Sequence, residues 1–329
     1  MSRTTESKDQ PFILPDSQAT AAWFGGAIEA GGTVSIGVSS YWKSGARRVK
    51  TQPHIEIHSH DQLMLRRLYE VYGGSIKDLF WGKGGYTAAE IVASTLPYTV
   101  ARREHALAMQ NWLNAENIDE KVRIAGELKG RAWQEDSEPE SYAELLRNPA
   151  FVAGIFDSRG YMQVRTAHTD RDKEDHAQYV HVGSKNIGLL KALESHFGGV
   201  VKVVKPAGTI INTGDTSFET QVDTIAWEVL SSKALNFLQF VGPYLQSQLP
   251  EGWDYQRSVI NEQRTQVLIE RILARIRMEL DQFEAGDVDR VSTNASLAEA
   301  FGIHKSTVSG YLSTRLTREE KRKRRGWAL

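Results

Sequence analysis

FGGAIEAGG at positions 24–32 and VAGIFDSRG at positions 152–160 are the two stretches that decide the fold of this chain. Each is rich in small residues, carries an acid at its sixth position and ends in glycine. The residues that follow alternate between apolar and polar, which is typical of a β-strand. We therefore predict that each stretch ends a helix, and that its last glycine allows the backbone to turn into a strand.

The two stretches lead two copies of the same element order, so the chain contains an internal repeat. Each copy is predicted to run helix, strand, strand, helix, strand, strand, helix, with a Gly-Gly pair ending the middle helix. The predicted strands lie at 33–40, 53–60, 75–81 and 86–94 in the first copy, and at 162–168, 177–184, 200–205 and 217–230 in the second. The helices that complete the two copies are predicted at 61–74, 96–113, 185–199 and 233–249.

The repeat divides the chain into four parts. We predict a first repeat at 18–133, an acidic linker at 134–147, a second repeat at 148–250 and a C-terminal region at 254–329. The linker is expected to be a solvated connector, because residues 134–144 hold five acids and no base. A long helix is expected at 255–283, where apolar residues recur at helical intervals. The expected fold class is α+β, with a small all-α domain at the C-terminal end.

Composition limits the function classes. The 329 residues include no cysteine, which excludes disulfides, thiolate zinc sites and a cysteine nucleophile. No apolar run approaches the roughly 20 residues that a membrane span needs, and the first residues are polar, so we predict a cytoplasmic, nucleoid-associated protein. The net charge is −1, but residues 315–325 hold seven basic and two acidic residues. A nearly neutral total can therefore contain a basic face.

The paired stretches and the repeat around them resemble the LAGLIDADG homing endonucleases, over about residues 18–250. The resemblance implies that the two motif helices pack against each other at the junction of the repeats. Close packing of two helices needs small side chains, which Gly25, Gly26, Ala153 and Gly154 supply. Two fused copies form a pseudo-dimer, so a monomer is expected to suffice, although the long helix could still support a homodimer.

The resemblance also implies that the two four-stranded sheets form a saddle on the major groove of double-stranded DNA. Alternate residues of each strand then face the DNA, where they contact phosphates and base edges. The positions predicted to bind DNA are Lys43, Arg47, Arg48, Lys50, Gln52, His54, Lys77 and Lys83 in the first copy, and Arg159, Gln163, Arg165, Arg171, Lys173, Lys202 and Lys205 in the second. Ser39, Tyr41, Glu56 and His168 are further outward positions.

The resemblance fails where the family holds its metal ions. In the family the eighth residue of each motif is an acid that helps to bind divalent metal ions, whereas here these residues are Gly31 and Arg159. The sixth-position acids Glu29 and Asp157 remain, and the family pattern implies a structural role for them. We predict no catalytic residues, no metal and no cofactor, because glycine offers no ligand and arginine is a permanent cation.

A basic residue usually supports the family's catalytic site from the start of the last helix of each repeat. Aligning LPYTVAR with GPYLQSQ places Arg102 at that position in the first copy and Gln248 in the second. This departure also favours a DNA-binding protein that has lost nuclease activity.

The segment 294–312 resembles a helix-turn-helix. Ala298 lies where the first helix would touch the second, and Gly302 follows four residues later in the turn. A recognition helix starting near His304 would present residues to the major groove, and the basic tail would add phosphate contacts. The positions predicted to contact DNA are Lys305, Ser306, Thr307, Ser309 and Arg315. Degenerate LAGLIDADG repeats followed by a helix-turn-helix also look like the WhiA-type regulators in architecture.

Three function classes remain at this point. The first is a non-catalytic, sequence-specific DNA-binding protein that regulates transcription. The second is an active homing endonuclease or nickase with non-standard metal ligands, in which case Mg²⁺ would be its cofactor. The third is an RNA-binding intron maturase, for which preference for A-form RNA over duplex DNA would be the test.

Overall fold

The computed structural model of the chain describes residues 14, 16–129, 137–168, 174–213, 216–247, 254–288, 291–301 and 304–326. Contacts divide the chain into two units. The larger unit is Asp16–Val259, and the smaller unit holds Ile260–Leu329 together with Met1–Pro15.

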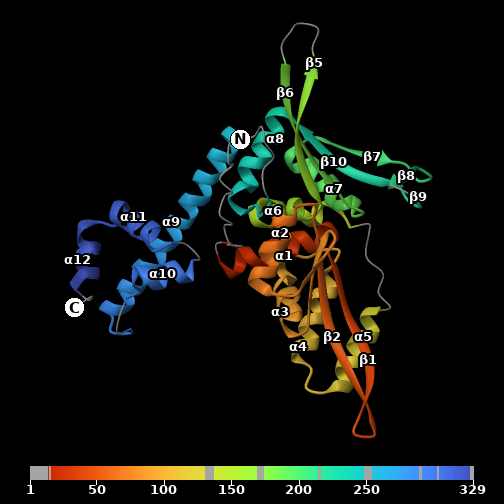
Figure 1. Ribbon diagram of the computed structural model, residues 1–329, viewed down its shortest axis with the longest axis horizontal. Coiled ribbons are helices and arrows are strands. Elements are labelled where there is room, and N and C mark those ends of the chain that lie inside the picture. The colour runs from red at the N-terminus through yellow and green to blue at the C-terminus, as the bar shows by residue number, and fades with distance from the viewer. Residues whose placement is uncertain are drawn as a thin grey trace, which may run out of the picture. The chain divides into compact units, whose positions relative to one another are not determined.

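The first repeat forms one sheet with helices on one of its faces (Figure 1). Its helices are α1 (Ser17–Gly31), α2 (Gln62–Tyr72) and α3 (Tyr86–Ser94), and its strands are β1 (Thr33–Lys43), β2 (Ala46–His58), β3 (Ser75–Lys77) and β4 (Phe80–Gly84). The antiparallel sheet has the order β1-β2-β4-β3. After α3 come the 3₁₀ turn η1 (Leu96–Tyr98) and the helices α4 (Arg103–Asn114) and α5 (Ile118–Lys129).

The second repeat follows the same plan. Its helices are α6 (Pro149–Arg159), α7 (Ile187–Phe197) and α8 (Ser231–Val241), and its sheet strands are β5 (Gly160–His168), β6 (Glu174–Gly183), β7 (Val200–Lys205) and β10 (Thr224–Leu230). The order β5-β6-β10-β7 matches that of the first sheet. A small separate hairpin, β8 (Ile210–Thr213) with β9 (Thr216–Glu219), lies between β7 and β10, and the 3₁₀ turn η4 (Gly242–Tyr244) follows α8.

The structure confirms the α+β class and the repeated αββαββα order, and it corrects three element predictions. The stretch 86–94, predicted as a strand, is helix α3, because its buried residues Ala88, Ala89, Ile91 and Val92 follow helical spacing. The predicted strand 75–81 contains a hairpin turn at Asp78, whose φ is +51°. The predicted strand 217–230 is divided between β9 and β10.

The motif helices α1 and α6 cross at very close range. A Cβ atom at Gly26 would lie 1.9 Å from the carbonyl oxygen of Phe151, and one at Gly154 would lie 1.9 Å from that of Trp23. The crossing is therefore built on this pair of glycines, one from each repeat. Gly25 instead makes room for Tyr98 of η1, because a Cβ atom at Gly25 would lie 2.6 Å from Cβ of Tyr98.

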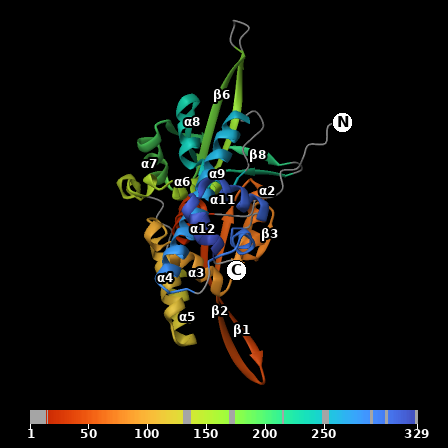
Figure 2. The same cartoon turned by 90° about the vertical axis from the view of Figure 1, so that its left-hand side faces the viewer.

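Each sheet packs its apolar face on the helices of its own repeat, and the two cores share a detail. The indole of Trp81 in β4 donates to the carbonyl oxygen of Gly73 at 2.7 Å, and that of Trp227 in β10 donates to Gly198 at 2.7 Å. Both glycines have positive φ, 65° and 73°, which explains the Gly-Gly stops predicted from sequence. Among the described residues of the larger unit, no helix lies on the opposite face of either sheet, here called the open face (Figures 1 and 2).

The acidic linker is only partly a solvated connector. Within the described residues 137–147, the side chains of Tyr142 and Leu146 are buried. The carbonyl oxygen of Ser137 would lie 1.7 Å from a Cβ atom at Gly188 in α7. This segment is packed between the repeats, because the Tyr142 hydroxyl binds Glu29 of α1 and Gly188 of α7 leaves room for the backbone of Ser137.

The smaller unit is all-α. It contains α9 (Asp254–Glu284) from Ile260 on, α10 (Asn294–Ala300), α11 (Lys305–Arg315) and α12 (Arg318–Gly326). Its core is formed by apolar side chains of the first three helices and Leu316, namely Ile269, Ile272, Leu273, Ile276, Leu280, Leu297, Ala298, Phe301, Val308, Leu312 and Leu316. The long helix predicted at 255–283 is thus present. No helix among the described residues is long and apolar enough to cross a membrane.

Candidate nucleic-acid interface

The open face of the first sheet contains most of the first repeat's residues that are predicted to bind DNA. Strand register places side chains that lie opposite each other on one face, and alternate residues on opposite faces. Ile55 and Ile57 are buried on the helix side, so Gln52 and His54 point to the open face. The same register adds the predicted residues Lys43, Arg48, Lys50 and Lys77 and the outward positions Ser39, Tyr41 and Glu56 to this face.

Two predicted residues lie on the other face. Arg47 pairs with Trp42, and both side chains point to the face opposite the open face. The Arg47 guanidinium donates to the hydroxyl of Ser40 at 3.2 Å. Lys83 pairs with the buried Ile55, and its Nζ would lie 3.4 Å from a Cβ atom at Gly73. The prediction treated every basic residue of a hairpin alike, although alternate residues face opposite ways.

Glycines of β4 shape the open face of the first sheet. A Cβ atom at Gly84 would lie 2.6 Å from Nε2 of Gln52, and one at Gly82 would lie 3.4 Å from Nε2 of His54. The side chains of Gln52 and His54 therefore lie across β4 in space that other residues would fill.

The open face of the second sheet contains Gln163, Lys202 and Lys205, as predicted. The backbone of Arg165 pairs with Ala177, two residues along β5 from Gln163, whereas His168 has the opposite parity. Arg171 and Lys173 lie outside the described residues.

A polar cluster that the sequence analysis missed lies on the same face. The Lys202 ammonium is 2.5 Å from the carboxylate of Glu228, which also accepts from the Tyr179 hydroxyl and lies 3.4 Å from Nδ1 of His181. Burial alone raises the pKa of Glu228, but the hydrogen bonds from Lys202 and Tyr179 outweigh it, so its pKa lies below the ordinary value. Tyr161 stacks on His181 at 4.5 Å between ring centroids. Strand parity gives the face of each residue, but the pairing of β6 and β7 with β10 brings these residues together.

At the junction of the repeats, the carboxylate of Glu29 is fully buried and serves as a backbone anchor. It accepts from the amides of Val100 (2.7 Å), Arg102 (2.9 Å) and Ala101 (3.2 Å), and from the hydroxyl of Tyr142 (2.7 Å). Glu29 thus holds the segment that leads into α4.

Asp157 does the same in the second repeat. Its carboxylate accepts from the amides of Gln246 (2.8 Å) and Ser247 (2.9 Å), from the Ser247 hydroxyl, and from the indole of Trp23 (2.8 Å). Burial raises the pKa of this carboxyl, as it does for Glu29, while the surrounding donors oppose the rise. Both sixth-position acids are therefore fully engaged in holding the chain.

These anchors support the alignment of LPYTVAR with GPYLQSQ, because each acid binds amides two to four residues past a Pro-Tyr pair. The alignment keeps Arg102 opposite Gln248, which lies outside the described residues. The Arg102 guanidinium is partly buried and donates to the carbonyl oxygen of Gly32 at 3.4 Å. Arg102 therefore lies beside the end of α1.

Arg159 fills the space between the two motif-helix ends. Its guanidinium is half-buried and donates to the carbonyl oxygen of Gly31 at 3.0 Å. Gly31 has a φ of +149°, and a Cβ atom there would lie 2.5 Å from Nε of Arg159. Burial lowers the pKa of Arg159, and no carboxylate pairs with it among the described residues. Its positive charge is favourable here because helix C-termini carry partial negative charge.

The positive charge of Arg159 affects the pKa of His58, at the end of β2. Burial and the nearby Arg159 lower the pKa of His58, while Glu56 opposes them. Three basic side chains therefore lie near the end of α1, namely those of Arg159, Arg102 and His58.

The residues at this junction do not fit a divalent metal ion. Mg²⁺ takes oxygen ligands, above all carboxylates. The eighth-position residues here are a glycine and a guanidinium, and the carboxylates of Glu29 and Asp157 are occupied by amide, hydroxyl and indole donors.

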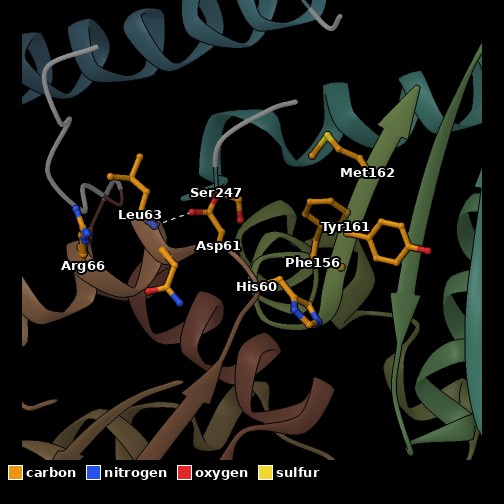
Figure 3. A pocket seen from close by; sticks show the side chains of 10 residues that line it. His60, Asp61, Leu63, Arg66, Phe156, Tyr161, Met162 and Ser247 are labelled. Atoms are coloured by element: carbon orange, nitrogen blue, oxygen red, sulfur yellow. Dashed lines mark hydrogen bonds between the residues drawn. The ribbon is translucent and has the colours of Figure 1, made fainter. Parts of the chain in front are cut away.

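The two repeats are tied together by a symmetric pair of serines. Ser59 donates to the carbonyl oxygen of Asp157 at 2.6 Å, and Ser184 donates to that of Ala30 at 3.0 Å. Next to Ser59, a pocket opens between the repeats, which His60 and Arg66 line from the first repeat and Phe156 and Tyr161 from the second (Figure 3). The serines fix each sheet to the motif helix of the other repeat.

In the smaller unit, α11 starts where the sequence predicted. His304 caps the helix through a bond of its Nδ1 with the amide of Ser306 at 3.3 Å. Of the predicted residues, Lys305, Ser306, Ser309 and Arg315 are exposed and Thr307 is partly so. Ala298 is buried on α10, and Gly302 lies outside the described residues.

The basic tail is partly engaged within the unit. Arg315 donates to the side chain of Gln266 at 3.4 Å, and Lys321 donates to the carbonyl oxygen of Ser313 at 2.7 Å. Lys323 lies 2.6 Å from the carboxylate of Glu284. The basic tail thus begins at the end of α11 and continues into helix α12.

No family model and no curated protein matches this sequence. Among solved structures, the chain is similar to LAGLIDADG homing endonucleases at low identity. I-SmaMI bound to cleaved DNA is 13% identical with a TM-score of 0.44, over 78% of this chain and 91% of that chain. I-GzeII in complex with its DNA target is 12% identical (TM-score 0.42; 76% and 90%), and I-LtrWI bound to target DNA is 11% identical (TM-score 0.43; 76% and 92%).

Proposed function

We propose that this protein binds double-stranded DNA sequence-specifically, does not cut it, and regulates transcription. The single observation that carries the loss of cutting is the Arg159 guanidinium, which is bonded to the Gly31 carbonyl between the motif-helix ends. A permanent cation at that point repels a second cation. The partial negative charge of the two helix ends therefore faces the guanidinium of Arg159, which is part of the protein itself.

DNA binding is supported by the open face of the first sheet. Residues 30–55 hold no acid, and their four basic residues are Lys43, Arg47, Arg48 and Lys50. Three of these four share the open face with Gln52 and His54, and amide and imidazole side chains can hydrogen-bond to base edges. A two-stranded ribbon also fits the major groove.

Sequence-specific regulation is supported by the smaller unit. We assign α10 and α11 as a helix-turn-helix, because α11 buries Val308 and Leu312 against the unit's core and exposes Lys305, Ser306 and Ser309 on the other side. A recognition helix needs such a polar outer face near its N-terminus. Arg159 is proposed to contact a backbone phosphate at the centre of the bound site.

Selection of bound sequences from random duplex DNA tests this proposal. We expect an enriched site of roughly 20 base pairs or more, because two modules read it, and we expect weaker binding to A-form RNA of the same sequence. No enrichment, or a preference for the RNA, would contradict it.

The double substitution Gly31→Asp with Arg159→Asp tests whether these two residues alone account for the proposed lack of cutting. It restores an acid at both eighth positions, so DNA binding retained together with Mg²⁺-dependent nicking would show that the remaining geometry is competent. Retained binding without nicking would show that the junction differs from a nuclease site in more than these two residues.

A further inference from the structure

The distal half of the β1–β2 hairpin projects beyond the helices as a two-stranded ribbon (Figures 1 and 2). On the helix side, α5 packs against both strands, and the last buried residues of the hairpin are Ile36 and Thr51, whose hydroxyl accepts from the indole of Trp112 in α4 at 3.0 Å. Six residue steps separate Gly37 from Lys43, which at about 3.3 Å each gives a ribbon of about 20 Å. Every residue from Val38 to Lys50 is exposed, so both faces of the ribbon are accessible beyond Thr51.

The two faces differ in chemistry. The open face of the sheet continues along the ribbon with Lys43, Arg48 and Lys50. The opposite face, here called the apolar ribbon face, consists of Val38, Trp42 and Val49 together with Arg47 and Ser40. Trp42 is 75% exposed, Val38 52% and Val49 42%. Such a row of exposed apolar side chains indicates a binding surface rather than ordinary exposure.

The charges around this face identify the partner. The ribbon carries four cations and no anion, so a polyanion is the complementary surface. A groove of duplex DNA offers phosphates beside sugar faces and base edges, and proteins use both arginine and apolar side chains there. Arg47 lies directly opposite Trp42 in the register, so one cation and one indole project from the same point of the ribbon.

We propose that the apolar ribbon face is a second DNA-contacting surface, on which Trp42 packs against sugar and base edges at the outer end of the bound site. The DNA then contacts both faces of the ribbon. This inference rests on the proposed DNA binding, and it adds a contact that the saddle alone does not require.

The test uses the full-length protein and the duplex recovered by selection. Aromatic contacts with bases are worth roughly 1–3 kcal/mol, so Trp42→Ala should weaken binding about 5- to 150-fold. The footprint should shorten at one end only, and Trp42→Phe should keep most of the affinity. Tyr69→Ala is the matched control, since Tyr69 is 49% exposed on α2, away from the ribbon, and should change neither quantity.

A second readout does not depend on affinity. The difference in fluorescence between the wild-type protein and Trp42→Phe isolates the Trp42 emission, which iodide should quench in the free protein and not in the complex. If the wild-type protein binds duplex DNA while Trp42→Ala keeps its affinity and footprint, and iodide still quenches Trp42 in the complex, only this inference fails. If the wild-type protein binds no duplex, the proposed function fails with it. Self-association in sedimentation that Trp42→Ala abolishes would assign the face to a second copy and overturn the inference.

Discussion

At the scale of single residues, the sixth and eighth positions of the two motifs have different roles in the structure. The sixth-position acids Glu29 and Asp157 each anchor a chain segment through buried hydrogen bonds, so the fold depends on them. The eighth-position residues Gly31 and Arg159 anchor no chain segment in this way. Arg159 instead binds the carbonyl oxygen of Gly31, between the two motif-helix ends.

Asp157→Asn should destabilise the protein by about 1–3 kcal/mol, because one amide NH₂ would face buried donors that now bind carboxylate oxygens. Urea unfolding measures the change. Asp119→Asn, at an exposed position of α5, is the control and should change the free energy of unfolding by less than about 0.5 kcal/mol. Equal stability of the two variants would contradict the anchoring role.

His58 should make stability depend on pH. Because burial and Arg159 lower its pKa below the ordinary 6.5, the folded state releases this proton at a pH where the unfolded chain still holds it. The free energy of unfolding should therefore fall as the pH falls through and below 6.5. In Arg159→Gln the pKa of His58, followed by NMR, should rise; an unchanged pKa would mean that the two groups are not close.

At the scale of elements, the crossing of α1 and α6 is the feature on which the larger unit depends. Gly154→Ala places a methyl group 1.9 Å from the carbonyl oxygen of Trp23, so the helices must separate. We expect a loss of more than about 3 kcal/mol, or a failure to fold.

Gly126→Ala is the matched control for the crossing. Gly126 is also helical, but a Cβ atom there meets nothing within 4 Å. Its replacement should stabilise the protein by roughly 0.5–1 kcal/mol, since alanine is the better helix former. If Gly154→Ala were as stable as this control in thermal unfolding, the close crossing would be wrong.

The sequence was sufficient for the repeat, the motif helices and the start of α11, because glycine stops and alternation are local signals. It was insufficient for α3, where alanines next to β-branched residues fit either a helix or a strand. It also misplaced Arg47 and Lys83, because sequence shows that a hairpin is basic but the face follows from register. The Glu228 cluster was missed because it joins strands about 50 residues apart.

At the scale of the whole molecule, two proposed DNA-binding modules share one chain, so the salt dependence of binding should reflect both. Removing one phosphate-binding cation should reduce the slope of log K against log salt by about 0.9. Arg48→Ala on the sheet and Lys305→Ala on α11 should each lower the slope by about one such step, and together by two. Lys129→Ala, exposed on α5, should leave it unchanged. A slope that responds to only one module would show that the other does not engage DNA.

Incubation of the wild-type protein with a plasmid that carries its selected site, in Mg²⁺ and in Mn²⁺, tests most directly whether this is a binder that cannot cut. With Arg159 between the motif-helix ends, the plasmid should stay supercoiled at protein concentrations that saturate the site. A nick or double-strand break within the site, dependent on the metal and on the protein, would contradict the account.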